Sequence, residues 1–155
     1  MSLLLLTLIV APAGQASGEP ATEARPAYQT ISVRGRIVWL RDEMEQDGVK
    51  LAAEVAKGQL VLRDAGGNLH PLLEDRRGHA FRLDPRLRAN EVELLVRRFA
   101  RHPYLQVLKV FEFDKKGVKY ELVYWCEICA ITMFELKPCD CCQGKIELQR
   151  REVER

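Results

Sequence analysis

All five cysteines of this 155-residue chain lie within one stretch of 17 residues, from position 126 to position 142. Two pairs of them have the C-x2-C spacing. Two such turns facing each other can present four thiolates to one ion in a tetrahedron, which is the arrangement that structural zinc prefers. The spacing therefore predicts a metal centre whose ligands are Cys126, Cys129, Cys139 and Cys142. It leaves Cys141 as a spare thiol that could substitute for Cys139 or Cys142.

Other states of these cysteines are also consistent with the sequence. Iron or Cu(I) could occupy the same thiolates in a redox or metal-handling protein that uses the C-x2-C pairs. In an oxidising compartment the five cysteines could instead form two disulfides and leave one odd thiol. Covalent haem attachment would need a histidine directly after the second cysteine, where Ala130 stands. Structural Zn²⁺ is our leading hypothesis.

The part of the chain that precedes the cysteines, and must position them, is predicted to form mainly strands. Apolar residues alternate with polar ones from Thr30 to Trp39, which predicts a strand, and Gly35 within it suits a bend or a close approach of two strands. Further strands are expected at 59–63 and 69–74, forming a hairpin, and at 91–99, 105–113 and 118–125. We expect a helix at about 49–57 after a loop, and a short one after Asp84-Pro85. Residues 75–78 read as a loop and 80–83 as an extended piece.

This order of elements resembles an OB-fold, a five-stranded Greek-key barrel. The resemblance rests on V-R-G-R-I-V-W at 33–39 and on L-R-A-N-E-V-E-L-L-V-R-R-F at 87–99. Residues 126 to about 148 resemble zinc ribbons and rubredoxin-like sites. Together these resemblances imply an OB-like barrel with short helices over residues 30–125, a zinc-ribbon-like β extension over 126–149 and a charged tail at 150–155. A plain antiparallel sandwich is the alternative.

The N-terminus predicts export. Residues 3–11 form an apolar run followed by small residues, as in a signal peptide over residues 1–16, although no Lys or Arg precedes the run. The run is too short to span a bilayer, so we expect no membrane span in the mature chain. Residues 17–29 read as a linker. The chain resembles small exported bacterial proteins, which implies a periplasmic or extracellular location; a buried N-terminal element is the alternative.

No catalytic motif is visible, since the chain has neither a P-loop, a G-x-G-x-x-G nor an H-E-x-x-H pattern. We therefore expect a non-enzymatic binding or assembly module whose partner is a protein or a small ligand. Nucleic-acid binding by the barrel is a further alternative, because residues 76–102 hold eight arginines. Expected export and a formal charge of only +2 argue against it. Its candidate residues are Arg76, Arg77, Arg82, Arg86 and Arg97.

Overall fold

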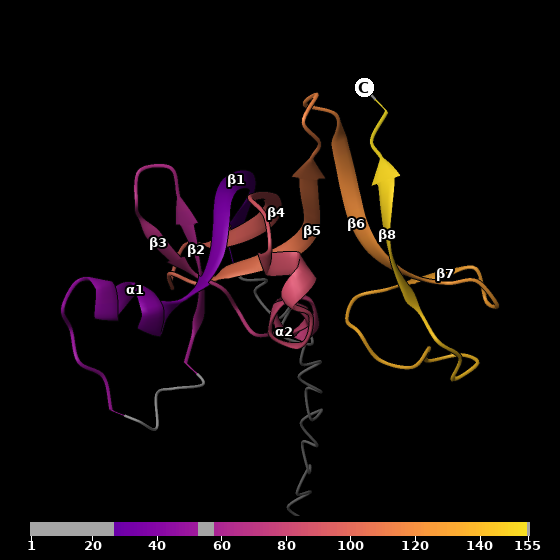
Figure 1. The fold of residues 1–155 in the computed structure, drawn as a ribbon, viewed down its shortest axis with the longest axis horizontal. Helices are drawn as coiled ribbons and strands as arrows, with labels where there is room; N and C mark the ends of the chain where they lie inside the picture. The colour runs from indigo at the N-terminus through magenta and orange to yellow at the C-terminus, as the bar shows by residue number, and fades with distance from the viewer. Residues whose placement is uncertain (1–26, 53–57, 155) are drawn as a thin grey trace, which may run out of the picture.

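The protein is mainly β, as the sequence predicts (Figure 1). The structure, a computed structural model, describes residues 27–52 and 58–154. Within these residues eight strands form one antiparallel sheet, accompanied by two short α-helices and a 3₁₀ helix. The strands are β1 (Tyr28–Trp39), β2 (Leu60–Asp64), β3 (Leu69–Pro71), β4 (Val92–Phe99), β5 (Leu105–Phe113), β6 (Lys119–Cys126), β7 (Ile131–Met133) and β8 (Glu147–Glu152). The helices are α1 (Leu40–Gln46), α2 (Arg76–Leu83) and the 3₁₀ helix η2 (Pro85–Arg88).

The described sheet is not closed into a barrel. Its strand order is β3-β2-β1-β4-β5-β6-β7, with β8 paired to β6. The chain at the end of β3 meets β5 only through one parallel bridge, Leu72 with Leu105, where the N–H of Leu73 donates to the Leu105 carbonyl at 2.9 Å. A closed barrel requires a continuous ladder around the sheet. The closed five-stranded barrel expected from the sequence is therefore not confirmed.

Strand β1 changes its partner at Gly35. Residues 28–35 pair with β4, and residues 35–39 pair with β2. A Cβ atom at Gly35 would lie 2.2 Å from the carbonyl oxygen of Arg63, so only glycine allows the two backbones to come this close. The close approach predicted from the sequence at this glycine is confirmed.

The helices differ from the sequence-based expectation. Helix α1 occupies positions expected to form a loop, whereas residues 49–52 of the expected helix are not helical and residues 53–57 lie outside the described part. Helix α2 replaces the expected loop and extended piece, because the Asp75 carboxylate accepts the N–H groups of Arg77 at 3.1 Å and Gly78 at 3.0 Å and caps its N-terminus. The expected short helix after Asp84 is η2. No helix in the described residues is long and apolar enough to cross a membrane.

One hydrophobic core extends from the first strands of the sheet to residues 126–142, the segment that carries the five cysteines (the cysteine segment). It includes Leu62 of β2, Leu94 of β4 and Phe81 of α2 together with the buried Cys126 and Cys139. The last strand, β8, pairs with residues 120–125 of β6, so the chain returns to the sheet after the cysteine loops. This packing holds the cysteine segment against the same core as the rest of the described sheet.

Candidate metal centre

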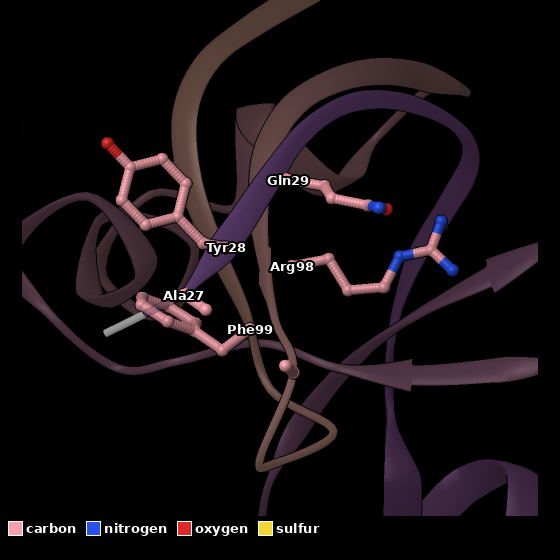
Figure 2. A pocket seen from close by; sticks show the side chains of 6 residues that line it. Ala27, Tyr28, Gln29, Arg98 and Phe99 are labelled. Carbon is pink, nitrogen blue, oxygen red and sulfur yellow. The ribbon is translucent and has the colours of Figure 1, made fainter. Parts of the chain in front are cut away.

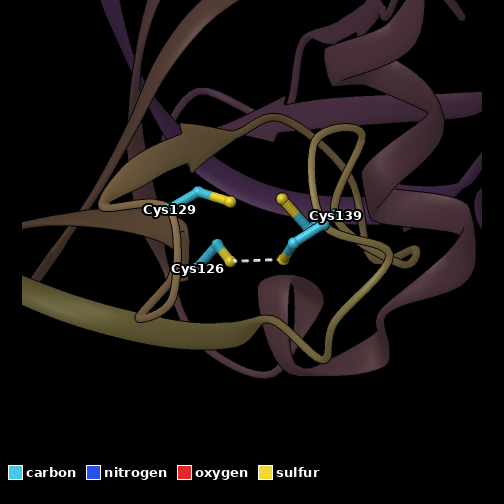
Figure 3. Close-up of side chains that lie close together, drawn as sticks. Cys126, Cys129 and Cys139 are labelled. Carbon is cyan, nitrogen blue, oxygen red and sulfur yellow. Dashed lines mark hydrogen bonds between the residues drawn. The ribbon is translucent and has the colours of Figure 1, made fainter.

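The sulfur atoms of four cysteines converge at the end of β6 (Figure 3). All four Sγ atoms lie within 4.8 Å of one another; they belong to Cys126, Cys129, Cys139 and Cys142. In a tetrahedral zinc site the sulfurs are about 3.8 Å apart, because Zn–S bonds are about 2.3 Å long. The Cys126 and Cys142 sulfurs are 3.5 Å apart, far beyond the roughly 2 Å of a disulfide. The four thiols could therefore hold one metal ion, and the structure brings together the four positions singled out by their spacing.

The two C-x2-C turns share two backbone features. The residue that follows the second cysteine has a positive φ in both, 53° at Ala130 and 57° at Gln143. Its N–H donates to the carbonyl of the first cysteine in both, Ala130 to Cys126 at 2.8 Å and Gln143 to Cys139 at 2.9 Å. This left-handed conformation is uncommon for residues other than glycine. The chain therefore closes both turns in the same way, even though neither has glycine at that position.

Backbone N–H groups in the second turn favour the thiolate form of Cys139, which is the form that could bind a metal ion. The N–H groups of Cys142 and Cys141 lower the pKa of Cys139 to about 7. The N–H of Gly144 donates to the Cys142 sulfur at 3.4 Å. A Cβ at Gly144 would lie 3.1 Å from that sulfur, so glycine leaves room for this contact.

The first turn has the same kind of hydrogen bond. The N–H of Cys129 acts to lower the pKa of Cys126, but burial and the neighbouring Cys142 and Cys139 thiols outweigh it, so that the pKa of Cys126 is raised. A bound cation would reverse this effect, because it stabilises thiolates that otherwise repel one another. The raised pKa means that the Cys126 thiol stays protonated unless a cation is bound beside it.

The four sulfurs differ in their access to solvent. Cys126 and Cys139 are completely buried, whereas Cys129 and Cys142 are half-buried. The fifth cysteine, Cys141, is exposed and is not among the four whose sulfurs converge. The neighbouring Cys141 and Cys142 side chains, together with burial, raise the pKa of Cys129. The sequence suggested Cys141 as a substitute within its own turn, for Cys139 or Cys142. In the structure the converging sulfurs include those of both Cys139 and Cys142, so Cys141 takes the place of neither.

A buried hydrogen bond connects β6, the strand that leads into the first cysteine turn, to the turn after α2. The Tyr124 hydroxyl donates to Asp84 Oδ2 at 2.7 Å, and Tyr124 precedes Cys126 by two residues in β6. Burial, followed by the hydrogen bond to Asp84, raises the pKa of Tyr124. The Arg86 guanidinium donates to both Asp84 carboxylate oxygens, at 2.9 Å and 2.7 Å, so the buried carboxylate has a charged partner.

Helix α2 makes two further contacts with the cysteine segment. The Arg77 guanidinium lies 4.6 Å from the ring centre of Phe134, and the His79 ring contacts the Glu135 carboxylate at 3.4 Å. Phe134 and Glu135 follow β7, between the two cysteine turns. Sequence reasoning missed this support because it assigned no helix to residues 76–83. The N-cap at Asp75 was the signal that could have revealed it.

The arginines of the nucleic-acid hypothesis are mostly occupied within the protein. Arg77 lies over Phe134, Arg82 forms an ion pair with Glu74, and Arg86 holds Asp84. Arg97 lies 4.7 Å from the ring centre of Tyr28 and donates to Gln106. The remaining arginine, Arg76, is exposed. Four of the five candidate arginines therefore already contact other side chains of the protein.

A surface hollow that the sequence did not indicate lies where β1 begins and β4 ends. Figure 2 shows Tyr28 and Phe99 on one side of it, with Gln29 and Arg98 on the other. The rings of Tyr28 and Phe99 meet edge to face at a centroid distance of 5.9 Å, as expected for residues paired across β1 and β4. The lining contains no nucleophile paired with a base, so we assign no chemistry to this hollow.

Comparison with known proteins adds no family to this description. No protein-family model matches the chain. No curated protein and no solved structure matches it at a significant level either.

Proposed function

We propose that the C-terminal segment binds one Zn²⁺ ion through four thiolates and that this ion has a structural role. The observation that carries the proposal is the convergence of four sulfurs within 4.8 Å, from two turns that are closed by the same hydrogen bond. Structural zinc sites use four protein ligands, whereas catalytic ones keep a position open for water. Burial of Cys126 and Cys139 supports a structural site, because their thiolates would be costly to bury without a cation.

We propose that the chain is an OB-like barrel joined to a zinc-ribbon-like extension. The strand order β3-β2-β1-β4-β5 supports the first part, as does the parallel bridge between Leu72 and Leu105. An α-helix between β3 and β4 is a further point of likeness. The pairing of β6 with both β7 and β8 around the two cysteine turns supports the ribbon.

We also propose that this protein is exported and serves as a binding or assembly module for a protein or a small ligand. The support for export is the apolar run at residues 3–11, which lies outside the described residues. The support for a binding role comes from the sequence, which has no P-loop, G-x-G-x-x-G or H-E-x-x-H pattern. A redox or metal-handling protein that uses the C-x2-C pairs is the alternative, and the exposed thiol of Cys141 within the second pair favours it.

The experiment that tests metal binding is a native mass measurement combined with elemental analysis and a thiol count. The protein should be purified from its own compartment without added metal. One zinc ion per chain and one reactive thiol is the expected result. A protein that holds no metal and whose mass corresponds to one or two disulfides would contradict the proposal. The Cys141→Ser variant is the matched control, because it should hold zinc and lose the reactive thiol.

A further inference from the structure

We propose that the protein binds the surface of an anionic phospholipid bilayer through aromatic and arginine side chains gathered where β1 begins and β4 ends. The binding is peripheral, with the rings at the level of the lipid headgroups, and it does not depend on the proposed metal binding. We call this group the ring–arginine surface, and its members are Tyr28, Arg98, Phe99, Arg101, His102 and Tyr104.

The aromatic rings of this surface form one connected row. The ring centres of Tyr28 and Phe99 are 5.9 Å apart, and those of Phe99 and His102 are 4.6 Å apart. The ring centre of Tyr104 lies 6.1 Å from that of His102. Tyr28 and Tyr104, which end the row, are 45% and 37% exposed. Because a tyrosine ring is apolar and its hydroxyl is polar, exposed tyrosines suit the boundary between lipid and water.

The charge that accompanies the rings is positive. The two stretches of chain that carry the surface, residues 27–33 and 94–108, contain no Asp or Glu, and Arg98 and Arg101 are both exposed. Neither arginine forms an ion pair with a residue that the structure describes. The Asp75 carboxylate reaches this region through Gln106, but it is also occupied in capping α2. The surface is therefore complementary in charge to anionic lipid headgroups.

The placement of the rings and the arginine favours a broad partner over a small ligand. Tyr28 and Phe99 lie on one side of the paired strands and Arg98 lies on the other (Figure 2), as neighbouring residues of a strand do. A small ligand on either side would meet only the rings or only the Arg98 guanidinium. A membrane surface that lies across the ends of β1 and β4 meets both.

Single-stranded nucleic acid also binds rings and arginines, but the contacts between these rings argue against it. Bases stack on ring faces that are open to them. The Arg97 guanidinium already lies over the Tyr28 ring, 4.7 Å from its centre, and the His102 ring lies beside that of Phe99 with a tilt of 35°. Rings that rest at the headgroups need exposure rather than an open face, which fits a membrane better.

Sedimentation with phospholipid vesicles tests the proposal on the protein purified from its own compartment. The vesicles are phosphatidylcholine with about 30% phosphatidylglycerol, and phosphatidylcholine alone, at low ionic strength. An arginine near an anionic surface strengthens binding about fivefold, so Arg98→Gln/Arg101→Gln should bind the anionic vesicles about 25-fold more weakly than the wild type. The matched control Lys115→Gln/Lys116→Gln removes two exposed charges from the turn between β5 and β6 and should bind like the wild type. Equal binding by all three proteins would overturn the proposal.

Tryptophan fluorescence shows which part of the molecule meets the lipid. Vesicles of the same anionic composition with brominated acyl chains should quench the emission of Tyr104→Trp more than that of the wild type. The wild type is the control, because Trp39 ends β1 at the opposite end from Tyr28 and Trp125 lies near the end of β6. Equal quenching of the two proteins would overturn the proposal. Binding of a dT oligonucleotide that is lost in Arg98→Gln/Arg101→Gln, without vesicle binding, would also overturn it and assign the surface to nucleic acid.

Discussion

The hydroxyl of Tyr124 donates a 2.7 Å hydrogen bond to the carboxylate of Asp84, and both side chains are almost completely buried. Tyr124 belongs to β6, which leads into the first cysteine turn, whereas Asp84 caps the 3₁₀ helix after α2. A buried carboxylate requires partners for its oxygens, and Asp84 has Tyr124 and Arg86. This contact therefore fixes the end of β6, where the first cysteine turn begins, relative to α2 and the 3₁₀ helix.

Replacing Tyr124 by phenylalanine should lower the free energy of unfolding by about 1–3 kcal/mol, because Asp84 would lose a partner for a buried oxygen. Urea unfolding followed by far-UV circular dichroism measures the change. Tyr120→Phe is the matched control: it lies on the same strand, it is only half-buried, and we expect its effect to stay within about 0.5 kcal/mol. Equal effects of the two substitutions would contradict the role assigned to the Tyr124 hydroxyl.

The stability that Asp84 contributes should depend on pH. The hydrogen bond from Arg86, together with those from Tyr124 and the backbone, lowers the pKa of Asp84 in the folded protein. A group whose pKa is lower in the folded state stabilises the protein above its unfolded pKa, about 3.9, and this contribution is lost as the pH falls towards the folded value. The difference in unfolding free energy between wild type and Asp84→Asn should thus be constant at pH 5–7 and shrink below about pH 4. A difference that does not change over this range would contradict the assignment.

Removing the metal should destabilise the C-terminal segment. We expect Cys126→Ser to abolish metal retention, because it removes a buried ligand and leaves three thiolates, whereas Cys141→Ser should leave retention nearly intact. A structural zinc site contributes on the order of 10 kcal/mol, so a chelator should unfold the segment containing β7 and β8 in the wild type. Hydrogen exchange on peptides from residues 127–152, with and without chelator, measures this. Unchanged protection after proven zinc removal would mean that the ion is not structural.

Glycine after the second cysteine of each turn should stabilise the protein. Ala130 has φ = 53°, a left-handed conformation that costs residues other than glycine about 1 kcal/mol. We expect Ala130→Gly to raise the unfolding free energy of the zinc-loaded protein by up to about 1 kcal/mol. The control Ala65→Gly lies in an exposed turn without a positive φ and should be neutral or destabilising. A loss of stability in Ala130→Gly would argue against strain at this turn.

Most of the strands could be predicted from local patterns of residues in the sequence. The alternation of apolar and polar residues that predicts β1 depends on only a few neighbouring positions, as does the Asp64–Asn68 turn between β2 and β3. The observed strands agree with those predictions to within a few residues. Helix α2 could not be recognised this way, since its sequence is short and polar and lacks helical periodicity. Its formation depends on the Asp75 cap and on Gly78, where a Cβ would lie 1.9 Å from the Leu73 carbonyl oxygen.

By itself, the sequence determined the main class of the fold, the break at Gly35 and the four cysteines that could share a metal ion, because each depends on spacing along a local stretch of chain. Only the tertiary structure decided that the sheet stays open between β3 and β5. It also decided that Asp84 contacts the strand before the cysteine turns and that α2 contacts the chain between them. It further decided that Cys126 and Cys139 are buried whereas Cys141 is exposed. The reason is physical: such contacts join residues distant in the chain, and their positions follow from how the strands pack on the common core.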